Sequence, residues 1–315
     1  MVTGKSPRRL IRILLLMLAV CAVLLVGFPI YDAWAGREMA RLMDGAEREP
    51  GTPYLKGGAP VRIDRGRDRV CLLLHGFPST PADFGDLPQA LDEAGWDVWA
   101  PCLRGYGTDA RDLAFISAEQ IVDGAGQELR RMRARYGRVA VVGFSMGGAV
   151  ATVLAAGPDP PDALVLVNPF YGVRHHVWYV LPPRVWHGFA RLFLENVVQP
   201  GFLVHVNRPE GRRQIVAYKA MPVHAIGEAL RIADRAVDAA PRLPAGMPVL
   251  VLLSERDGVA APGAVRACYE RLPSAAKSLR TYARSDHVLF LDYERREAEQ
   301  AVVEHLAGGS AAPAH

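Results

Sequence analysis

Ser145 lies in a pattern that could make it a nucleophile. The pattern reads Gly143-Phe-Ser-Met-Gly147 and follows the apolar, β-branched run at residues 139–142, which predicts a buried strand. The small and apolar residues 147–156 predict a helix, so a sharp turn joins strand and helix at the serine. Such a turn strains the backbone, and the two glycines let strand and helix approach without Cβ clashes. Because the pattern is common, an ordinary turn remains the alternative unless the chain also supplies a base, an acid and oxyanion donors.

Other residues that could do chemistry follow three more predicted strands. His75 follows the strand predicted at residues 70–74. Asp257 follows the one predicted at residues 249–253, and His287 follows the last one, at residues 278–282. Functional groups of open α/β sheets gather at the carboxyl ends of the strands, so we expect these side chains near Ser145. A serine hydroxyl is a weak nucleophile until an imidazole takes its proton, and that imidazole needs a carboxylate to hold its tautomer. The set therefore predicts a nucleophile, an acid and a base in the chain order Ser, Asp, His.

Two other carboxylates compete with Asp257 for the role of the acid. Glu255 lies close to the same strand end, and Asp286 precedes His287 directly, so that its side chain points elsewhere. We favour Asp257 and keep both alternatives. Among the nine histidines, His287 alone follows a strand late in the chain and precedes a final helix, which favours it as the base.

The elements that must position these residues alternate along the chain. Strands are predicted at residues 70–74, 96–100, 139–142, 163–167, 249–253 and 278–282, and helices at 81–94, 117–136, 147–156, 263–272 and 293–306. Ser117 and Gln120 form a capping-box pattern at the start of the second of these helices. The alternation predicts a mostly parallel sheet with helices on both faces. From Pro169 to about residue 240 the pattern stops, and this stretch, rich in aromatic residues and histidine, predicts an insertion.

Three stretches carry a specific family resemblance. They read Cys71-Leu-Leu-Leu-His-Gly-Phe-Pro-Ser-Thr-Pro81, Ala94-Gly-Trp-Asp-Val-Trp-Ala-Pro101 and Arg104-Gly-Tyr-Gly-Thr108. With them, residues 65–308 or so resemble the bacterial carboxylesterases and monoacylglycerol lipases of the α/β-hydrolase superfamily. The resemblance implies a mostly parallel sheet of the eight-stranded type with a helical cap at the insertion. It also implies a serine hydrolase that cleaves carboxylic esters.

The resemblance assigns a role to each candidate residue. Matched position by position, Ser145 is the nucleophile, Asp257 the acid and His287 the base. The main-chain N–H groups of Phe77 and Met146 match the oxyanion hole of the family.

The loop regions around the site add two further expectations. His75, in the His-Gly loop, is expected to position the oxyanion turn rather than to act as the base. The family often has Gly-His-Gly where this chain has Gly105-Tyr106-Gly107, a departure that concerns substrate preference because the loop supplies no triad member.

Other functions stay open at this point. An acyltransferase, an amidase or a peptidase of the same fold would form the same acyl-enzyme, and the residues named so far do not separate these reactions. A membrane-tethered binding protein on a hydrolase scaffold is a further alternative. It would be expected to lack a triad member or a glycine of the turn, and here all are present.

The N-terminus predicts a segment that meets a membrane. Basic residues (Lys5, Arg8, Arg9, Arg12) precede an uninterrupted apolar run at residues 13–28, which extends past Pro29 to Tyr31. The run fits either a single-pass anchor or a signal segment cleaved after Ala33-Trp-Ala35, and its length favours the anchor. The basic flank predicts that the N-terminus stays inside and that the catalytic domain lies on the extracytoplasmic side.

Composition limits what else the chain can be. The 315 residues, 50% hydrophobic and 22% charged, are typical of one large globular domain. The net charge of +4 comes without a long basic stretch. Five arginines between residues 130 and 138 could contact a nucleic acid or an anionic lipid, but we favour a solvated helix face and expect no nucleic-acid partner. The cysteines (Cys21, Cys71, Cys102, Cys268) lack metal-ligand spacing and histidine neighbours, so we expect no metal, no cofactor and no disulfide framework.

These patterns divide the chain into six segments. They are a membrane anchor or signal segment at 1–31, a juxtamembrane helix and linker at 32–60, a first part of the hydrolase core at 61–168, a cap insertion at 169–240, a second part of the core at 241–308 and a disordered tail at 309–315. The expected partners are a small-molecule or lipid ester as substrate and a membrane at the N-terminal segment.

Overall fold

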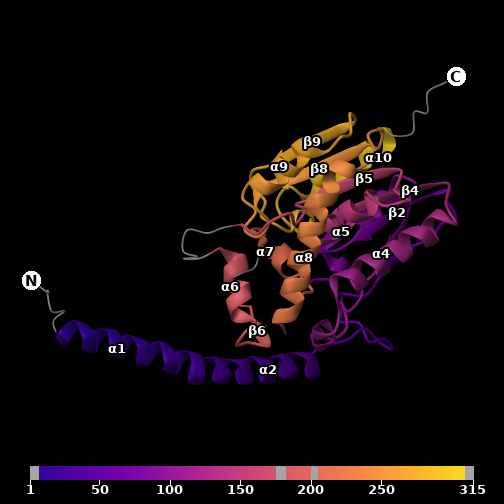
Figure 1. The fold of residues 1–315 in the computed structure, drawn as a ribbon. Helices are drawn as coiled ribbons and strands as arrows, with labels where there is room; N and C mark the ends of the chain where they lie inside the picture. Colours follow the sequence, from indigo (N-terminus) through magenta and orange to yellow (C-terminus); the bar gives the residue numbers. More distant parts are fainter. Residues whose placement is uncertain (1–6, 175–181, 200–204, 309–315) are drawn as a thin grey trace, which may run out of the picture.

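The fold is that of a computed structural model, which describes residues 7–174, 182–199 and 205–308. The predicted tail at 309–315 and part of the predicted cap insertion lie outside the described residues. Two units are visible in Figure 1: an α/β domain, and a long N-terminal helix that extends away from it.

A seven-stranded sheet forms the centre of the α/β domain, in the order β1-β3-β2-β4-β5-β8-β9. The strands are β1 (Val61–Ile63), β2 (Arg69–Leu74), β3 (Asp97–Ala100), β4 (Arg138–Phe144), β5 (Ala163–Val167), β8 (Val249–Ser254) and β9 (Lys277–Tyr282). All neighbours run parallel except β1, which pairs antiparallel with β3. The predicted mostly parallel sheet is therefore present, with seven strands in the described part of the chain instead of the eight of the expected type.

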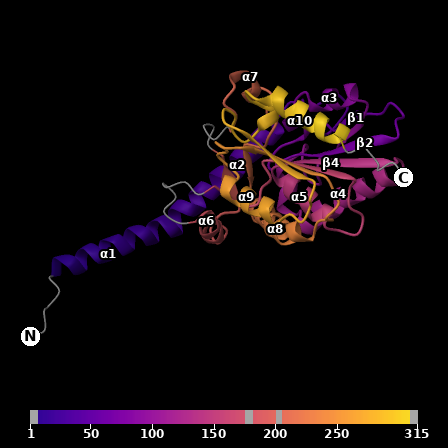
Figure 2. The ribbon, with the colours of Figure 1, turned by 90° about the horizontal axis from the view of Figure 1, so that it is seen from above.

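Helices cover both faces of the sheet, as predicted. On one face lie α4 (Ala118–Arg133), α5 (Met146–Ala155), α8 (Val223–Ala239) and α9 (Pro262–Arg271), and on the other lie α3 (Leu87–Glu93) and α10 (Arg295–Gly308), an arrangement visible in Figure 2. Apart from the half-buried Arg138 at the start of β4, the central strands β4 and β5 are buried because both faces are covered, which explains their apolar sequences. The predicted capping box is formed, since the Ser117 side chain accepts from Gln120 N–H and the Gln120 side chain accepts from Ser117 N–H.

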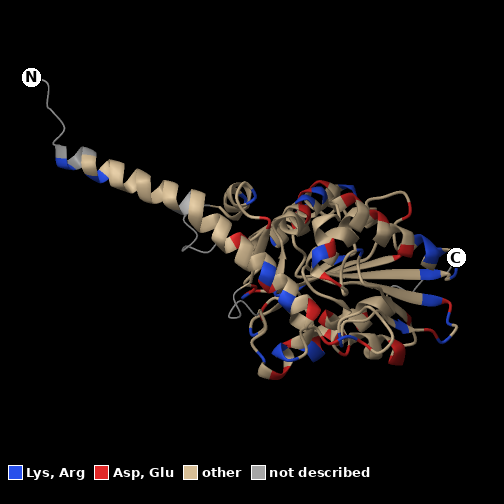
Figure 3. Cartoon of the chain, turned by 90° about the horizontal axis from the view of Figure 1, so that it is seen from below, with Lys and Arg blue, Asp and Glu red and all other residues tan. Residues whose placement is uncertain are grey.

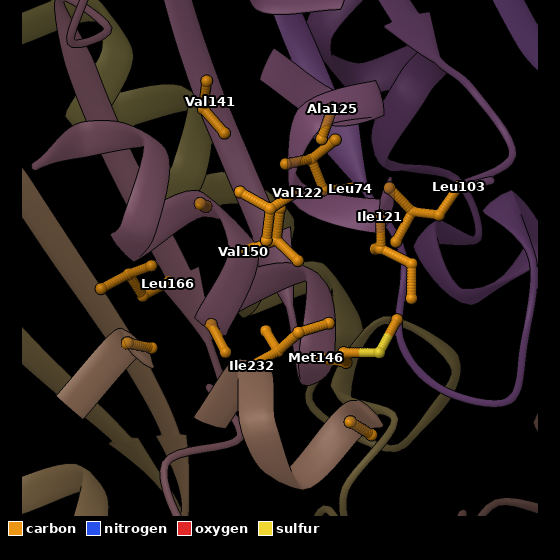
Figure 4. Packing of buried hydrophobic residues seen from close by; sticks show 14 of the residues in the cluster. Leu74, Leu103, Ile121, Val122, Ala125, Val141, Met146, Val150, Leu166 and Ile232 are labelled. Carbon is orange, nitrogen blue, oxygen red and sulfur yellow. The ribbon is translucent and has the colours of Figure 1, made fainter. Parts of the chain in front are cut away.

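The core between the sheet, α4, α5 and α8 holds the start of α5 in place. In Figure 4, Met146 of α5 lies among Ile121 of α4, Ile232 of α8 and Leu103, and its side chain is fully buried. A side chain packed on all sides leaves the backbone little freedom. The first turn of α5, directly after Ser145, is therefore fixed by the core.

The insertion after β5 contains short elements and one long helix. The elements are α6 (Pro183–Ala190), β6 (Asn196–Val198), α7 (Pro209–Arg212), β7 (Ala220–Pro222) and α8, and β6 pairs antiparallel with β7. The strand-helix pattern stops in this stretch of the sequence because β6 and β7, with three residues each, are too short to show an alternation. Its last helix, α8, packs on α5 and belongs to the helical layer of the domain.

The N-terminal segment is a nearly continuous helix. It consists of α1 (Pro7–Ala22), one π-helical stretch (Val23–Gly27) and α2 (Phe28–Asp44), so helical structure continues well into the stretch predicted as helix and linker. Residues 11–22 are all exposed, whereas α2 buries Ala35, Met39 and Met43 against the domain. Figure 3 shows blue basic residues at the start of this helix, followed by a long uncharged stretch.

Candidate active site

Ser145 occupies a strained turn between β4 and α5. Its backbone φ is 52° and its ψ is −119°, a conformation that L-residues rarely adopt. A Cβ on Gly147 would collide with the carbonyl oxygen of Leu74, and one on Gly143 would collide with the carbonyl oxygen of Gly147. Both glycines are therefore required by the close approach of strand and helix, and the turn is a nucleophile elbow in geometry rather than an ordinary turn.

The structure brings the three predicted triad side chains together. His287 Nε2 lies 2.8 Å from Ser145 Oγ, and His287 Nδ1 lies 2.7 Å from Asp257 Oδ2. A carboxylate only accepts hydrogen bonds, so Nδ1 carries the proton and Nε2 accepts from the serine hydroxyl. This arrangement can remove the serine proton and hold the resulting imidazolium.

Asp257 is oriented by the turn that follows β8. Its Oδ1 accepts the N–H groups of Val259 at 2.7 Å and Ala260 at 2.8 Å, and its side chain is fully buried. Two main-chain donors on one oxygen leave the other oxygen for the imidazole. The carboxylate is thus preorganised for His287.

The electrostatics of the site favour a charged imidazole. Burial opposes the positive charge of His287, but the charge and hydrogen bond of Asp257 outweigh it, with smaller contributions from Asp286 and Asp83, and the pKa of His287 is raised. The Asp257 carboxylate therefore stabilises a positive charge on the buried imidazole of His287.

Neither alternative acid contacts the imidazole ring. Glu255 pairs with Arg266 and its side chain is 40% exposed. Asp286 accepts the main-chain N–H groups of Gly258 and His287, both at 2.7 Å, so it ties the acid loop to the histidine loop. The geometry leaves Asp257 as the partner of His287 Nδ1.

Two main-chain N–H groups are available for an oxyanion. Among the hydrogen bonds of the described residues, none is donated by the N–H of Phe77 or Met146. The parallel register places Leu74 of β2 beside Gly143 of β4, so the turn after β2 adjoins the serine. Both N–H groups can therefore donate hydrogen bonds to a ligand oxygen at this edge of the sheet.

His75 supports the oxyanion turn as a neutral side chain. Its Nε2 accepts the N–H of Leu103 at 2.9 Å, so its Nδ1 carries the proton and donates to the carbonyl oxygen of Gly76 at 2.9 Å. Complete burial lowers the pKa of His75 to about 4. Its ring contacts that of Tyr106, which stands at the departure from the family pattern and also contacts Phe77.

Sequence reasoning missed Asp83 beneath the same turn. Its two carboxylate oxygens accept the N–H of Gly76 at 3.2 Å and the hydroxyl of Ser79 at 2.7 Å, on either side of Phe77. Burial raises the pKa of the Asp83 carboxyl to about 6, although both hydrogen bonds act in the opposite direction. The sequence contains no signal for this residue, because one of its partners is a backbone N–H group and the other is a serine outside the triad and the oxyanion hole.

Asn168 is the second site residue that was missed. It is fully buried with a φ of 42°, and its Nδ2 donates to the carbonyl oxygen of His287 at 2.7 Å and to Ser254 Oγ at 3.0 Å. Its Oδ1 accepts the N–H of Ser254 at 2.7 Å. A signal for it existed, since Asn168 directly follows the strand β5 and so stands at the same sheet edge as Ser145.

A cavity of about 660 Å³ lies away from these residues. It is lined by side chains of α6, α8 and the loop after η3 (Ala110–Ala114), and neither Ser145 nor His287 belongs to its lining.

The chain matches a protein-family model described as serine aminopeptidase S33 (Hydrolase_4) over residues 66–294. It is 24% identical to a thermostable monoacylglycerol lipase of Bacillus sp. strain H-257 over 243 residues, which cover 77% of this chain and 92% of the relative. It is 25% identical to a carboxylesterase of Bacillus subtilis strain 168 over 252 residues, 77% of this chain and 94% of the relative.

Solved structures share its fold. A structure of the metagenome-derived lipolytic enzymes LipS and LipT has a TM-score of 0.72 at 23% identity, over 81% of this chain and 99% of that chain. A soluble variant of the Saccharomyces cerevisiae monoglyceride lipase has a TM-score of 0.67 at 16% identity, over 85% of this chain and 91% of that chain. These likenesses confirm the α/β-hydrolase fold. Because the family model covers well over half of its length, the chain belongs to the serine aminopeptidase S33 family of α/β-hydrolases.

Proposed function

We propose that the protein is a serine hydrolase that cleaves carboxylic esters, with monoacylglycerols or similar lipid esters as its substrate class. The observation that carries the proposal is the continuous hydrogen-bonded series from Asp257 through His287 to Ser145, at a strained turn flanked by obligatory glycines. The names of the two bacterial relatives, a monoacylglycerol lipase and a carboxylesterase, support the ester class.

The proposed reaction has two halves. In the first, Ser145 Oγ attacks the ester carbonyl while His287 Nε2 takes its proton, and the N–H groups of Phe77 and Met146 bind the oxyanion. His287 then gives the proton to the departing alcohol, which leaves an acyl-enzyme. In the second half, His287 activates a water molecule that frees the acid and restores Ser145. Asp257 holds the imidazole tautomer throughout.

Amide cleavage is a second candidate because the family is described as serine aminopeptidases. An aminopeptidase and an esterase share the acyl-enzyme and differ in the leaving group. The test is a parallel assay of the purified protein on monoacylglycerols, on p-nitrophenyl esters and on aminoacyl p-nitroanilides. Turnover of esters far above that of anilides supports the proposal, and the opposite order replaces it with peptidase function. Acyl transfer would appear as a new ester product when a second alcohol is added.

We further propose that the N-terminal helix is an uncleaved single-pass membrane anchor, with the catalytic domain on the extracytoplasmic side. Ile11–Asp44 is the one described helix long and apolar enough to cross a membrane, with a mean hydropathy of 3.0 in its most apolar window and no burial there. Cleavage after Ala35 would remove residues that pack on the domain, since Ala35 itself is fully buried and Asp32 hydrogen-bonds to the main chain at residues 195 and 196.

Carbonate extraction and N-terminal sequencing test the anchor. An uncleaved chain that stays in the carbonate-washed membrane supports it. A mature chain that starts at Gly36 and is found in the soluble fraction would replace the anchor by a signal segment.

A further inference from the structure

The N-terminal helix contacts the domain at the point where its apolar run ends. Phe28, the first residue of α2, stacks on Phe193 with ring centroids 5.3 Å apart and meets Phe189 edge-on at 6.1 Å. Residues 11–22 and 25–27 are exposed, so no described contact to the domain buries the helix before Phe28. The end of the proposed membrane span is therefore also the start of the contact with the inserted segment after β5.

Polar contacts fix this junction. Asp32 is the first charged residue after Arg12, and its Oδ1 accepts the N–H groups of Glu195 at 2.8 Å and Asn196 at 2.9 Å. The hydroxyl of Tyr31 accepts the N–H of Val198 at 3.2 Å. Together with the aromatic contacts, these hydrogen bonds hold β6 and the chain after α6 against the start of α2.

The helix α6 beside this junction has an apolar surface that is partly exposed. None of the residues of α6 is buried, and Val185, Trp186 and Phe189 are 50%, 43% and 38% exposed, followed by Leu192 at 67%. Figures 1 and 2 agree that α6 runs across the direction of the N-terminal helix, close to the boundary between α1 and α2. If α1 spans a bilayer, α6 lies along the bilayer surface instead of pointing into it or away from it.

Side-chain types on and near α6 match the interface of a bilayer. Tryptophan is enriched at the headgroup level, where its amphipathic ring is stable, and arginine extends to the headgroups with its charge. Trp186 lies on α6, and the exposed Arg191 directly follows this helix. Trp34 of α2 is 47% exposed and lies about 9 Å beyond Phe28 along the helix axis, towards the C-terminus of α2. This is the pattern of a helix that lies in the interface plane.

We propose that the α6 surface, defined as Val185, Trp186, Phe189 and Leu192, rests on the bilayer that the N-terminal helix spans, held there by the contacts of Phe28, Tyr31 and Asp32. The proposal rests on the proposed membrane anchor. Because the insertion starts from the carboxyl end of β5, the sheet edge at which Ser145 lies, this contact would present the catalytic side of the domain to lipid esters in the same bilayer.

Depth-dependent quenching of tryptophan fluorescence tests the contact. The full-length chain is reconstituted into phosphatidylcholine vesicles brominated either near the headgroup or deep in the acyl chain, and the signal of Trp186 is obtained by difference from Trp186→Phe. We expect the headgroup-proximal bromines to quench Trp186 more strongly than the deep ones. A Trp186 signal that neither lipid quenches overturns the inference, whereas loss of the whole chain from carbonate-washed vesicles overturns the anchor.

A matched pair of variants gives the functional test. Leu192→Glu places a charge in the α6 surface. Phe115→Glu places the same charge on another exposed apolar side chain, which is 83% exposed and lies directly after η3. Arg111 of η3 pairs with Asp44 at the far end of α2. Leu192→Glu is expected to lower turnover of a long-chain monoacylglycerol in vesicles about tenfold while turnover of dissolved p-nitrophenyl butyrate stays unchanged. Phe115→Glu is expected to change neither rate. Equal loss on both substrates, or no loss on either, contradicts the proposal.

Discussion

Asn168 donates its side-chain amide to the main-chain carbonyl oxygen of His287 across 2.7 Å. The two residues are far apart in the chain, and Asn168 reaches this position from a left-handed backbone conformation at the end of β5. The same side chain is hydrogen-bonded to Ser254 at the end of β8. It therefore connects the loop of the base to the strand that leads to the acid.

This connection predicts that Asn168 positions His287. Asn168→Asp keeps the shape but loses the amide donor, and we expect kcat to fall by about ten- to a hundredfold with little change in KM, because the imidazole is misplaced rather than substrate binding weakened. The control is Asn168→Gly, which tolerates the positive φ and isolates the side-chain contribution. An unchanged kcat in Asn168→Asp, or a loss confined to KM, contradicts this role.

The buried carboxyl of Asp83 predicts that the stability of the fold depends on pH. Its folded pKa of about 6 lies above the ordinary 3.8, so folding favours its protonated form, and its contribution to stability is full at low pH and is lost as the pH rises through 6. The free energy of unfolding of the wild type minus that of Asp83→Asn should therefore fall by about 2.5 kcal/mol between pH 4 and pH 7. Denaturant unfolding at several pH values measures the difference, and a difference that does not change with pH refutes the assignment.

The raised pKa of His287 predicts where activity is lost in acid. The imidazole must be neutral to accept the serine proton, so kcat/KM should decline as the pH falls through a value above the ordinary 6.5.

Asp257→Asn should lower kcat by about 10⁴ because the tautomer is no longer held. Glu255→Gln is the matched control and should retain the activity of the wild type. If Glu255→Gln is the inactive variant, the acid is wrongly assigned.

The elbow glycines predict a steric effect on stability. Gly147→Ala places a methyl group against the carbonyl oxygen of Leu74. This clash should lower the free energy of unfolding by about 3 kcal/mol or more, or prevent folding. Gly263→Ala is the comparison, because nothing lies within 4 Å of the added Cβ and the residue is in α9. It should be neutral or stabilising by up to about 1 kcal/mol. Thermal unfolding of both variants distinguishes the clash from a general intolerance of alanine.

The features that sequence reasoning predicted are those with a local signal. Apolar runs mark the buried strands of a covered parallel sheet, and glycines around Ser145 mark the elbow, because both leave a trace within a few neighbouring positions. The chain order of Ser145, Asp257 and His287 is equally visible once strand ends are known. These signals sufficed for the fold and for the three side chains that meet.

Long-range hydrogen bonds to the backbone left no such trace. Asp83 and Asn168 act on the main chain of Gly76 and His287, and any residue type can supply a main-chain group, so no motif predicts these two contacts. The place of Asn168 directly after β5 indicates only that it lies at the same sheet edge as Ser145. The docking of Asp32 on the main chain of Glu195 was hidden for the same reason. Short strands such as β1 and β6 were missed because three residues are too few to show a period.

The most direct test of the account is covalent labelling of the nucleophile. The full-length protein in detergent is treated with a fluorophosphonate, digested and analysed by mass spectrometry, alongside Ser145→Ala. The account predicts one stoichiometric adduct on Ser145, together with loss of p-nitrophenyl ester turnover that follows the labelled fraction, and neither adduct nor turnover in the variant. An adduct on another residue, or a Ser145→Ala protein that still turns over the ester at the rate of the wild type, would contradict it.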